Sequence, residues 1–168
     1  MVAGDLSFDP IEEADRQWRA HGWGDAAPGM GVVTSIMRAQ QVLLARADAV
    51  LGTFGLTFAR FEVLTLLSFT REGCLPMGKL GSRLQVHPAS VTSAVDRLVG
   101  QGYVERVRGD ADKRVVRAVL TEAGRESVEE ATGALNREVF EAPGLPSQEV
   151  RELTDRLTSL RSGLGDGA

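Results

Sequence analysis

The sequence predicts a mainly α-helical protein with a small β-hairpin, arranged as a winged helix-turn-helix with further helices at both ends. Two short helical segments, 77–84 and 88–99, enclose a turn of three residues. Two segments rich in β-branched residues, 103–108 and 114–120, follow and enclose a Gly- and Asp-containing turn. Longer segments with helical apolar spacing lie on either side of this centre.

The first third of the chain is predicted to be helical. Three helices are expected, over 9–21, 31–51 and 57–69. Asp9 suits a helix cap and Pro10 suits the first helical position. Residues 22–30, rich in Gly, Ala and Pro, are expected to form a loop. Thr57 is expected to cap the third helix through its side chain.

The remaining elements are predicted from turn and cap residues. Leu75-Pro76 forms a short extended link before the first short helix, and Pro88 starts the second. Thr121 is expected to cap a long helix over 121–140. Pro143 and Pro146 then interrupt the chain before a last helix over 147–160.

Charge is unevenly distributed along the chain. The 168 residues carry a net charge of −4, yet the segment 79–117 contains eight basic and four acidic residues. Phosphate binding depends on the local field rather than on total charge. A nucleic-acid partner is therefore compatible with this segment, although charge alone leaves a solvated, mixed-charge surface equally open.

Composition and spacing exclude several classes of function. No apolar run reaches the ~18 residues of a membrane span, and no secretory signal is visible, so a cytoplasmic location is expected. Cys74 is the single cysteine, which excludes an intrachain disulfide. His21 and His87 are the only histidines, far apart in sequence, and no phosphate loop, catalytic triad or metal spacing is present. We therefore do not expect an enzyme or a metal site.

The second short helix has the features of a DNA-reading helix. Val91, Val95 and Leu98 are spaced to face inward. The opposite face is small and polar, with Ser90, Ser93 and Arg97, and Thr92 and Asp96 lie beside it. Small side chains let a helix enter the major groove, where hydroxyls and arginine bond to bases or phosphates. A merely solvated helix face is the alternative.

The hairpin that follows favours the DNA-binding interpretation. Basic residues cluster on or beside it: Arg106, Arg108, Lys113, Arg114 and Arg117. A narrow minor groove attracts inserted arginine. Asp112 lies two residues before Arg114 and is expected to position that side chain by an ion pair. The predicted DNA contacts are Ser90, Thr92, Ser93, Arg97, Arg108, Lys113 and Arg114.

Several motifs resemble the MarR (multiple antibiotic resistance regulator) family. They are Leu56-Thr57, the segment 84–98, Gly102-Tyr103-Val104-Glu105-Arg106, Asp110-Ala111-Asp112-Lys113-Arg114 and Leu120-Thr121-Glu122-Ala123-Gly124. The resemblance spans about 31–162. It implies a homodimer on double-stranded DNA, a recognition helix at 88–100, and a wing whose Arg114 enters the minor groove. It also implies an inverted-repeat operator, with repression by steric occlusion as the commoner mode.

The resemblance also implies a division of the chain. Residues 1–30 form an N-terminal extension, 31–55 and 121–165 form the dimerisation region, and 56–120 form the winged DNA-binding domain. Helices 31–51 and 121–160 carry apolar stripes that a small winged domain leaves uncovered, which independently favours a dimer.

The resemblance further implies a small-molecule effector, here hypothesised to be an aromatic or purine-type anion. Trp18, Asp96 and Arg114 are similar to the residues of some urate-responsive members, and Trp23 competes with Trp18 for its role. Arg38 is a candidate for binding a carboxylate, with a structural salt bridge as the alternative. Two other functions stay open: redox sensing through Cys74, and a winged protein-interaction module without specific DNA binding.

Overall fold

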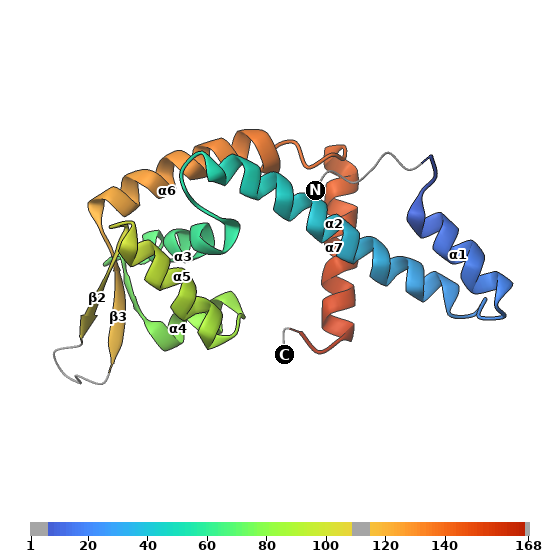
Figure 1. Ribbon diagram of the computed structural model, residues 1–168, viewed down its shortest axis with the longest axis horizontal. Coiled ribbons are helices and arrows are strands. Elements are labelled where there is room, and N and C mark those ends of the chain that lie inside the picture. Colours follow the sequence, from blue (N-terminus) through green and yellow to red (C-terminus); the bar gives the residue numbers. More distant parts are fainter. Residues whose placement is uncertain (1–6, 109–114, 167–168) are drawn as a thin grey trace. The chain divides into compact units, whose positions relative to one another are not determined.

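The computed structural model describes residues 7–108 and 115–166, and its elements follow the predicted order (Figure 1). The helices are α1 (Pro10–Ala20), α2 (Ala27–Gly52), α3 (Phe58–Ser68), α4 (Met77–Leu84), α5 (Pro88–Gly100), α6 (Glu122–Leu135) and α7 (Ser147–Gly163), with a π-helical turn η1 (Asn136–Phe140) after α6. The strands are β1 (Cys74–Pro76), β2 (Val104–Arg108) and β3 (Val116–Leu120). The predicted fold class is confirmed.

The chain divides into two compact units, residues 1–46 and 47–168. This division reflects contacts within a single chain. The predicted division into an extension, a dimerisation region and a DNA-binding domain depends on an assembly of two chains, and it stays a prediction. Among the described residues, no helix is long and apolar enough to cross a membrane.

Unit 1 contains α1 and the first part of α2. As expected, Asp9 caps α1, and its side chain accepts a hydrogen bond of 2.8 Å from the Ile11 amide. The expected loop over 22–30 is wrong in its second half, because α2 already begins at Ala27 and includes Pro28. A proline in the first helical turn costs no hydrogen bond, since the first amides of a helix have no partner within it.

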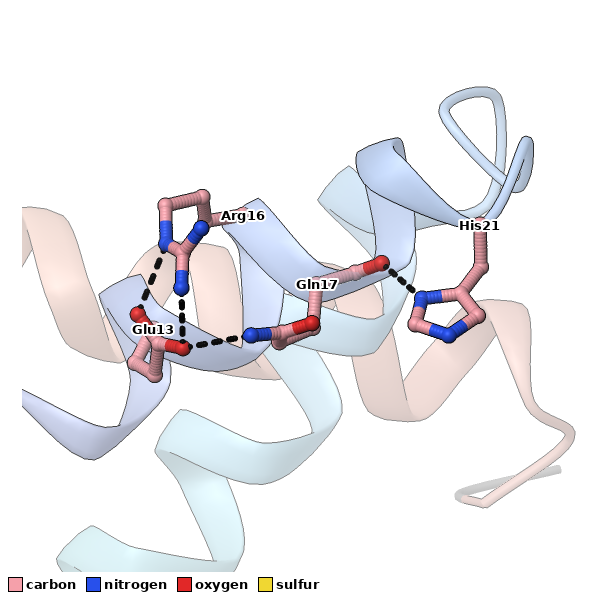
Figure 2. A network of polar contacts seen from close by, with 4 residues as sticks. All are labelled: Glu13, Arg16, Gln17 and His21. Carbon is pink, nitrogen blue, oxygen red and sulfur yellow. Dashed lines mark hydrogen bonds and ion pairs between the residues drawn. The ribbon is translucent and has the colours of Figure 1, made fainter.

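Polar side chains run along the surface of α1 (Figure 2). The Glu13 carboxylate accepts hydrogen bonds from Arg16 at 2.6 and 2.8 Å and from Gln17 at 2.7 Å. The bonds from Arg16 and then from Gln17 lower the pKa of Glu13 from 4.5 to about 2. His21 donates from Nδ1 to the Gln17 carbonyl at 2.8 Å. The bonds to Glu13 therefore stabilise α1 while this carboxylate is ionised.

Unit 2 contains the hydrophobic core. Its innermost large side chains are Leu51, Leu64, Leu67, Leu80, Leu98 and Leu135, with Val63, Val95 and Val104. They come from the end of α2, from α3 to α6 and from β2, so one core holds all these elements together. Burial of this kind contributes roughly 25 cal/mol for each Å² of apolar surface removed from water.

The hairpin belongs to a three-stranded antiparallel sheet in the order β1-β3-β2. Arg106 of β2 lies opposite Ala118 of β3, and Leu75 of β1 lies opposite the same alanine on the other side. The segment expected as an extended link is therefore a third strand. Its pairing with β3 holds the hairpin next to the start of α4, which follows β1 directly.

The start of α3 differs from the prediction in one respect. Thr57 occupies the cap position, but its side chain does not cap the helix. Instead the Phe58 amide donates to Asp48 Oδ1 at 2.7 Å, and the Thr57 hydroxyl accepts from Arg60 Nε at 3.3 Å. Asp48 lies ten residues earlier, on α2, so the cap joins α2 to α3.

The junction of β3 with α6 is closely packed. Thr121 caps α6 as predicted, accepting from the Gly124 amide at 3.0 Å and donating to the Gly102 carbonyl at 2.8 Å. A Cβ on Gly124 would overlap with the Tyr103 carbonyl oxygen. Only glycine fits at this position, and α6 is thereby fixed directly against the start of β2.

Candidate nucleic-acid interface

The turn between α4 and α5 sets the direction of the second helix. Gln85 ends α4 in the left-handed conformation, with φ of 54°. His87 precedes the helix, and its Nδ1 accepts from the Ala89 amide at 3.2 Å. Pro88 then occupies the first helical position, where its fixed φ favours the helix. Local sequence therefore determines where α5 begins.

The inner face of α5 is buried as predicted. Val91, Val95 and Leu98 are at most 2 % exposed, and they belong to the core of unit 2. The predicted DNA-contacting residues of this helix are Ser90, Thr92, Ser93 and Arg97, and all four are exposed. The helix therefore presents a face of short hydroxyl side chains and one arginine to solvent, a surface suited to entering a major groove.

The wing and α5 are joined by Arg106, a residue absent from the predicted set of contacts. Its Nη1 lies 2.6 Å from Asp96 Oδ1, and its Nη2 donates to the Thr92 carbonyl at 3.4 Å. Asp96, a candidate effector ligand on sequence grounds, thus pairs with a strand of the wing. Sequence spacing gives no signal for this pair, because ten residues separate its members and they lie on different elements.

Only some of the predicted wing residues lie within the described ranges 7–108 and 115–166. Arg108 ends β2 and is exposed. Arg117, on β3 opposite Val107, is exposed as well. Asp112, Lys113 and Arg114 lie outside the described residues, so their predicted ion pair and groove contacts stay predictions.

The candidate effector residues of unit 1 form an aromatic cluster. The rings of Trp18 and Trp23 meet edge to face at 5.6 Å, and His21 stacks on Trp23 at 5.5 Å. The two tryptophans therefore form one cluster rather than two alternative sites. Trp23 is 54 % exposed. Arg38, on α2, donates a long hydrogen bond of 3.5 Å to Gln41.

Cys74 begins β1 and is partly buried. Its thiol lies 3.8 Å from Glu72 Oε2, a distance at which sulfur donates a weak hydrogen bond to a carboxylate. Within the described ranges, no group of three or more His, Cys, Asp or Glu side chains is placed to hold a metal ion. Redox sensing through Cys74 stays a hypothesis.

Comparisons with known proteins agree with this geometry. The model of the MarR family matches residues 56–116. A curated relative, the uncharacterized HTH-type transcriptional regulator YhbI of Bacillus subtilis, is 30% identical over 125 residues, which cover 71% of this chain and 79% of YhbI. The crystal structure of Sco5413, a MarR family transcriptional regulator from Streptomyces coelicolor, is 46% identical with a TM-score of 0.76, covering 83% of this chain and 97% of Sco5413.

A second solved structure was determined with a nucleic acid. It is a cysteine-to-serine mutant of MarR from E. coli complexed with operator DNA, which is 25% identical to this chain with a TM-score of 0.72. The match covers 80% of this chain and 96% of that protein. Together, the identity to YhbI and Sco5413 and the extent of the matches show that the chain belongs to the MarR family of non-enzymatic, DNA-binding transcription regulators.

Proposed function

We propose that the protein binds an inverted-repeat operator as a homodimer and represses transcription by occluding the promoter. The observation that carries this proposal is the division of α5 into two faces. Val91, Val95 and Leu98 are fixed in the core, while the exposed face carries only hydroxyls, Arg97 and the paired Asp96 among its polar groups. A recognition helix held in this way reads base edges with Ser93 and Arg97. The proposed location is the cytoplasm, where the bacterial chromosome lies.

Exposed apolar residues support the dimer. On α2 of unit 1, Val32, Val33, Ile36, Met37 and Leu43 are all at least 36 % exposed. On α7 of unit 2, Leu153, Leu157 and Leu160 follow the 4-3 spacing of a helix–helix seam and are similarly exposed. Apolar faces of this extent are stabilised by burial against a second copy.

The first experiment is a mobility shift on the DNA upstream of the protein's own gene, at two salt concentrations. The expected result is a specific shift that weakens strongly with salt and protects an inverted repeat. Absence of any shift leads to a selection from random DNA sequences. Failure of that selection would leave the alternative of a winged module for protein contacts.

The dimer is tested by light scattering after size-exclusion chromatography. The double variant Leu153→Glu/Leu157→Glu places charges in the proposed seam and is expected to be monomeric and to lose operator affinity. Thr158→Glu, an exposed position on the same helix, is the matched control and is expected to stay dimeric. A monomeric parent protein would overturn the dimer.

The effector proposal is that an aromatic or purine-type anion binds near the aromatic cluster of Trp18 and Trp23. The support is the exposed ring of Trp23 and the cationic Arg38 on α2 of the same unit. A thermal-shift screen of such anions tests it, with Trp23→Ala as the comparison. A screen in which no anion shifts the melting temperature contradicts the proposal.

A further inference from the structure

We propose that the groove between α3 and α5 seats a phosphate of the DNA backbone, bound by Arg60 and positioned by Gln101. The inference rests on the proposed function and adds a contact outside the recognition helix and the wing. The groove has a volume of about 670 Å³, and its polar lining comes from Thr57, Arg60, Ser90, Ser93 and Arg97. The rest of its lining is alanine, so both walls are low and open to solvent.

A relay of hydrogen bonds holds Arg60 in place. Arg60 Nη1 donates to Gln101 Oε1 at 2.8 Å, and Gln101 Nε2 donates to the Gly55 carbonyl at 2.9 Å. Arg60 Nε donates to the Thr57 hydroxyl at 3.3 Å. Gln101 is the residue that ends α5, and Gly55 lies in the turn before α3. The relay therefore fixes the guanidinium relative to both helices.

The charge of Arg60 is not neutralised by these bonds. Both acceptors are uncharged, one a hydroxyl and one an amide oxygen. The other ionisable group of the groove is Arg97, which is also cationic, and no carboxylate lines the groove within the described residues. Asp96, the acidic residue next to Arg97, pairs instead with Arg106 of the wing. The groove is thus a cationic site with polar donors on both walls.

A phosphate fits this groove better than a base edge. Ser90 and Ser93 belong both to the groove and to the exposed face of α5. Because these residues are shared, a DNA major groove read by that face would bring its bordering strand close to the groove between α3 and α5. Phosphate contacts fix the register of a protein on DNA, and arginine bonds phosphate through two parallel donors. The first amide of α3, that of Phe58, is already bonded to Asp48 and is therefore not available to the phosphate.

Substitution of Arg60 tests the proposed phosphate site, with the operator identified by the mobility shift as the DNA. Arg60→Ala is expected to weaken binding about threefold to tenfold, equally on operator and random DNA, and to lower the salt slope by about one. Arg60→Lys keeps the charge without the paired donors, so its DNA affinity is expected to lie between those of the parent protein and Arg60→Ala. Circular dichroism and the melting temperature establish that each variant is folded.

Neutral phosphates locate the contact. In a series of operator duplexes, each carries one uncharged methylphosphonate in place of a phosphate. At one position this replacement is expected to weaken binding of the parent protein but not binding of Arg60→Ala. Gln101→Ala is expected to weaken binding less than Arg60→Ala and to have no further effect in the Arg60→Ala background. If Gln101 had a purely structural role, the losses of affinity in Gln101→Ala and Arg60→Ala would add in the double variant. Gln101→Ala would then also show the same methylphosphonate pattern as the parent protein.

The outcomes separate this inference from the proposed function. If the parent protein binds no DNA, the proposed function fails first. If the parent binds its operator and Arg60→Ala binds with the same affinity and salt slope, the phosphate seat is overturned and the operator-binding function stands. A change in sequence preference, rather than a uniform loss, also overturns the seat, because it would assign Arg60 to base reading.

Discussion

Arg106 and Asp96 join the wing to the recognition helix through a contact of 2.6 Å between Nη1 and Oδ1. The same guanidinium reaches the Thr92 carbonyl, one turn earlier on α5. One side chain of β2 thus contacts a carboxylate and a backbone group of α5 at the same time. This pair, which we call the wing–helix bridge, links the wing directly to α5.

Breaking the wing–helix bridge is expected to affect DNA binding more than folding. Partly exposed ion pairs contribute only about 0–1 kcal/mol to stability, so Arg106→Ala leaves the melting temperature nearly unchanged. A wing that no longer keeps its angle is expected to weaken operator affinity about tenfold, or 1.4 kcal/mol, by fluorescence anisotropy. The exchanged pair Asp96→Arg/Arg106→Asp is expected to recover part of that loss. A loss equal to that of Glu105→Gln, the neighbouring control on β2, would show that the bridge has no positioning role.

Substitutions on α5 and on the wing tip are expected to differ in kind. Arg97→Ala and Ser93→Ala change the face of α5 that we propose reads bases, so we expect an altered sequence preference at a cost of about 1–3 kcal/mol on the operator. Arg114→Ala is expected to weaken binding with little sequence bias. Competition between operator and mutated operator duplexes gives the specificity ratio of each variant. Equal ratios for all three would show that the groove assignment is wrong.

Gly124→Ala is expected to destabilise unit 2. The added methyl group would overlap with the Tyr103 carbonyl, and relief requires α6 to move away from the sheet. Overpacking of this kind costs about 1–3 kcal/mol, measured as a lower free energy of unfolding in urea. Gly78→Ala on α4 is the control, since its methyl group would meet nothing within 4 Å and is expected to be neutral or stabilising. Equal stability of the two variants would contradict the close packing at Gly124.

Acidification is expected to loosen α1. Since the folded pKa of Glu13 is lowered to about 2, its stabilising bonds are fully present above the unfolded value of 4.5 and are lost as pH falls towards 2. Both tryptophans of the chain lie in unit 1, so their fluorescence reports on this unit alone. The emission is expected to change between about pH 5 and pH 2. Glu13→Gln is expected to reduce that change, leaving the part due to the Asp15–Arg19 pair, whereas Glu12→Gln keeps it. An unaltered titration in Glu13→Gln would assign the transition to another group.

Local chemistry makes the centre of the fold predictable. The residues from Gln85 to Pro88 determine where α4 ends and α5 begins, and both boundaries follow from turn and proline chemistry alone. Apolar spacing on α5 likewise identifies the buried face. The predicted start of α2 is wrong because Pro28 and its glycine neighbours resemble a loop, although the first turn of a helix tolerates proline.

Contacts between distant residues are not predictable in this way. The cap of α3 comes from Asp48, and the support of Arg60 comes from Gln101, 41 residues further along the chain. Neither pair follows a helical or strand period, so each depends on how the elements pack. The sequence does not distinguish Arg106 from the other basic residues of the hairpin. Its partner, Asp96, is determined by how β2 packs against α5.

The close approach at Gly124 makes α6 an extension of the sheet rather than a hinged neighbour. The helix of 14 residues is about 21 Å long at 1.5 Å per residue. A rotation of about 5° at its far end would therefore displace the end that meets the sheet by about 2 Å. The regular backbone of α6 gives way to the π-helical turn Asn136–Phe140, and a bend of this helix is expected there. We therefore expect the sheet and the start of α6 to move together.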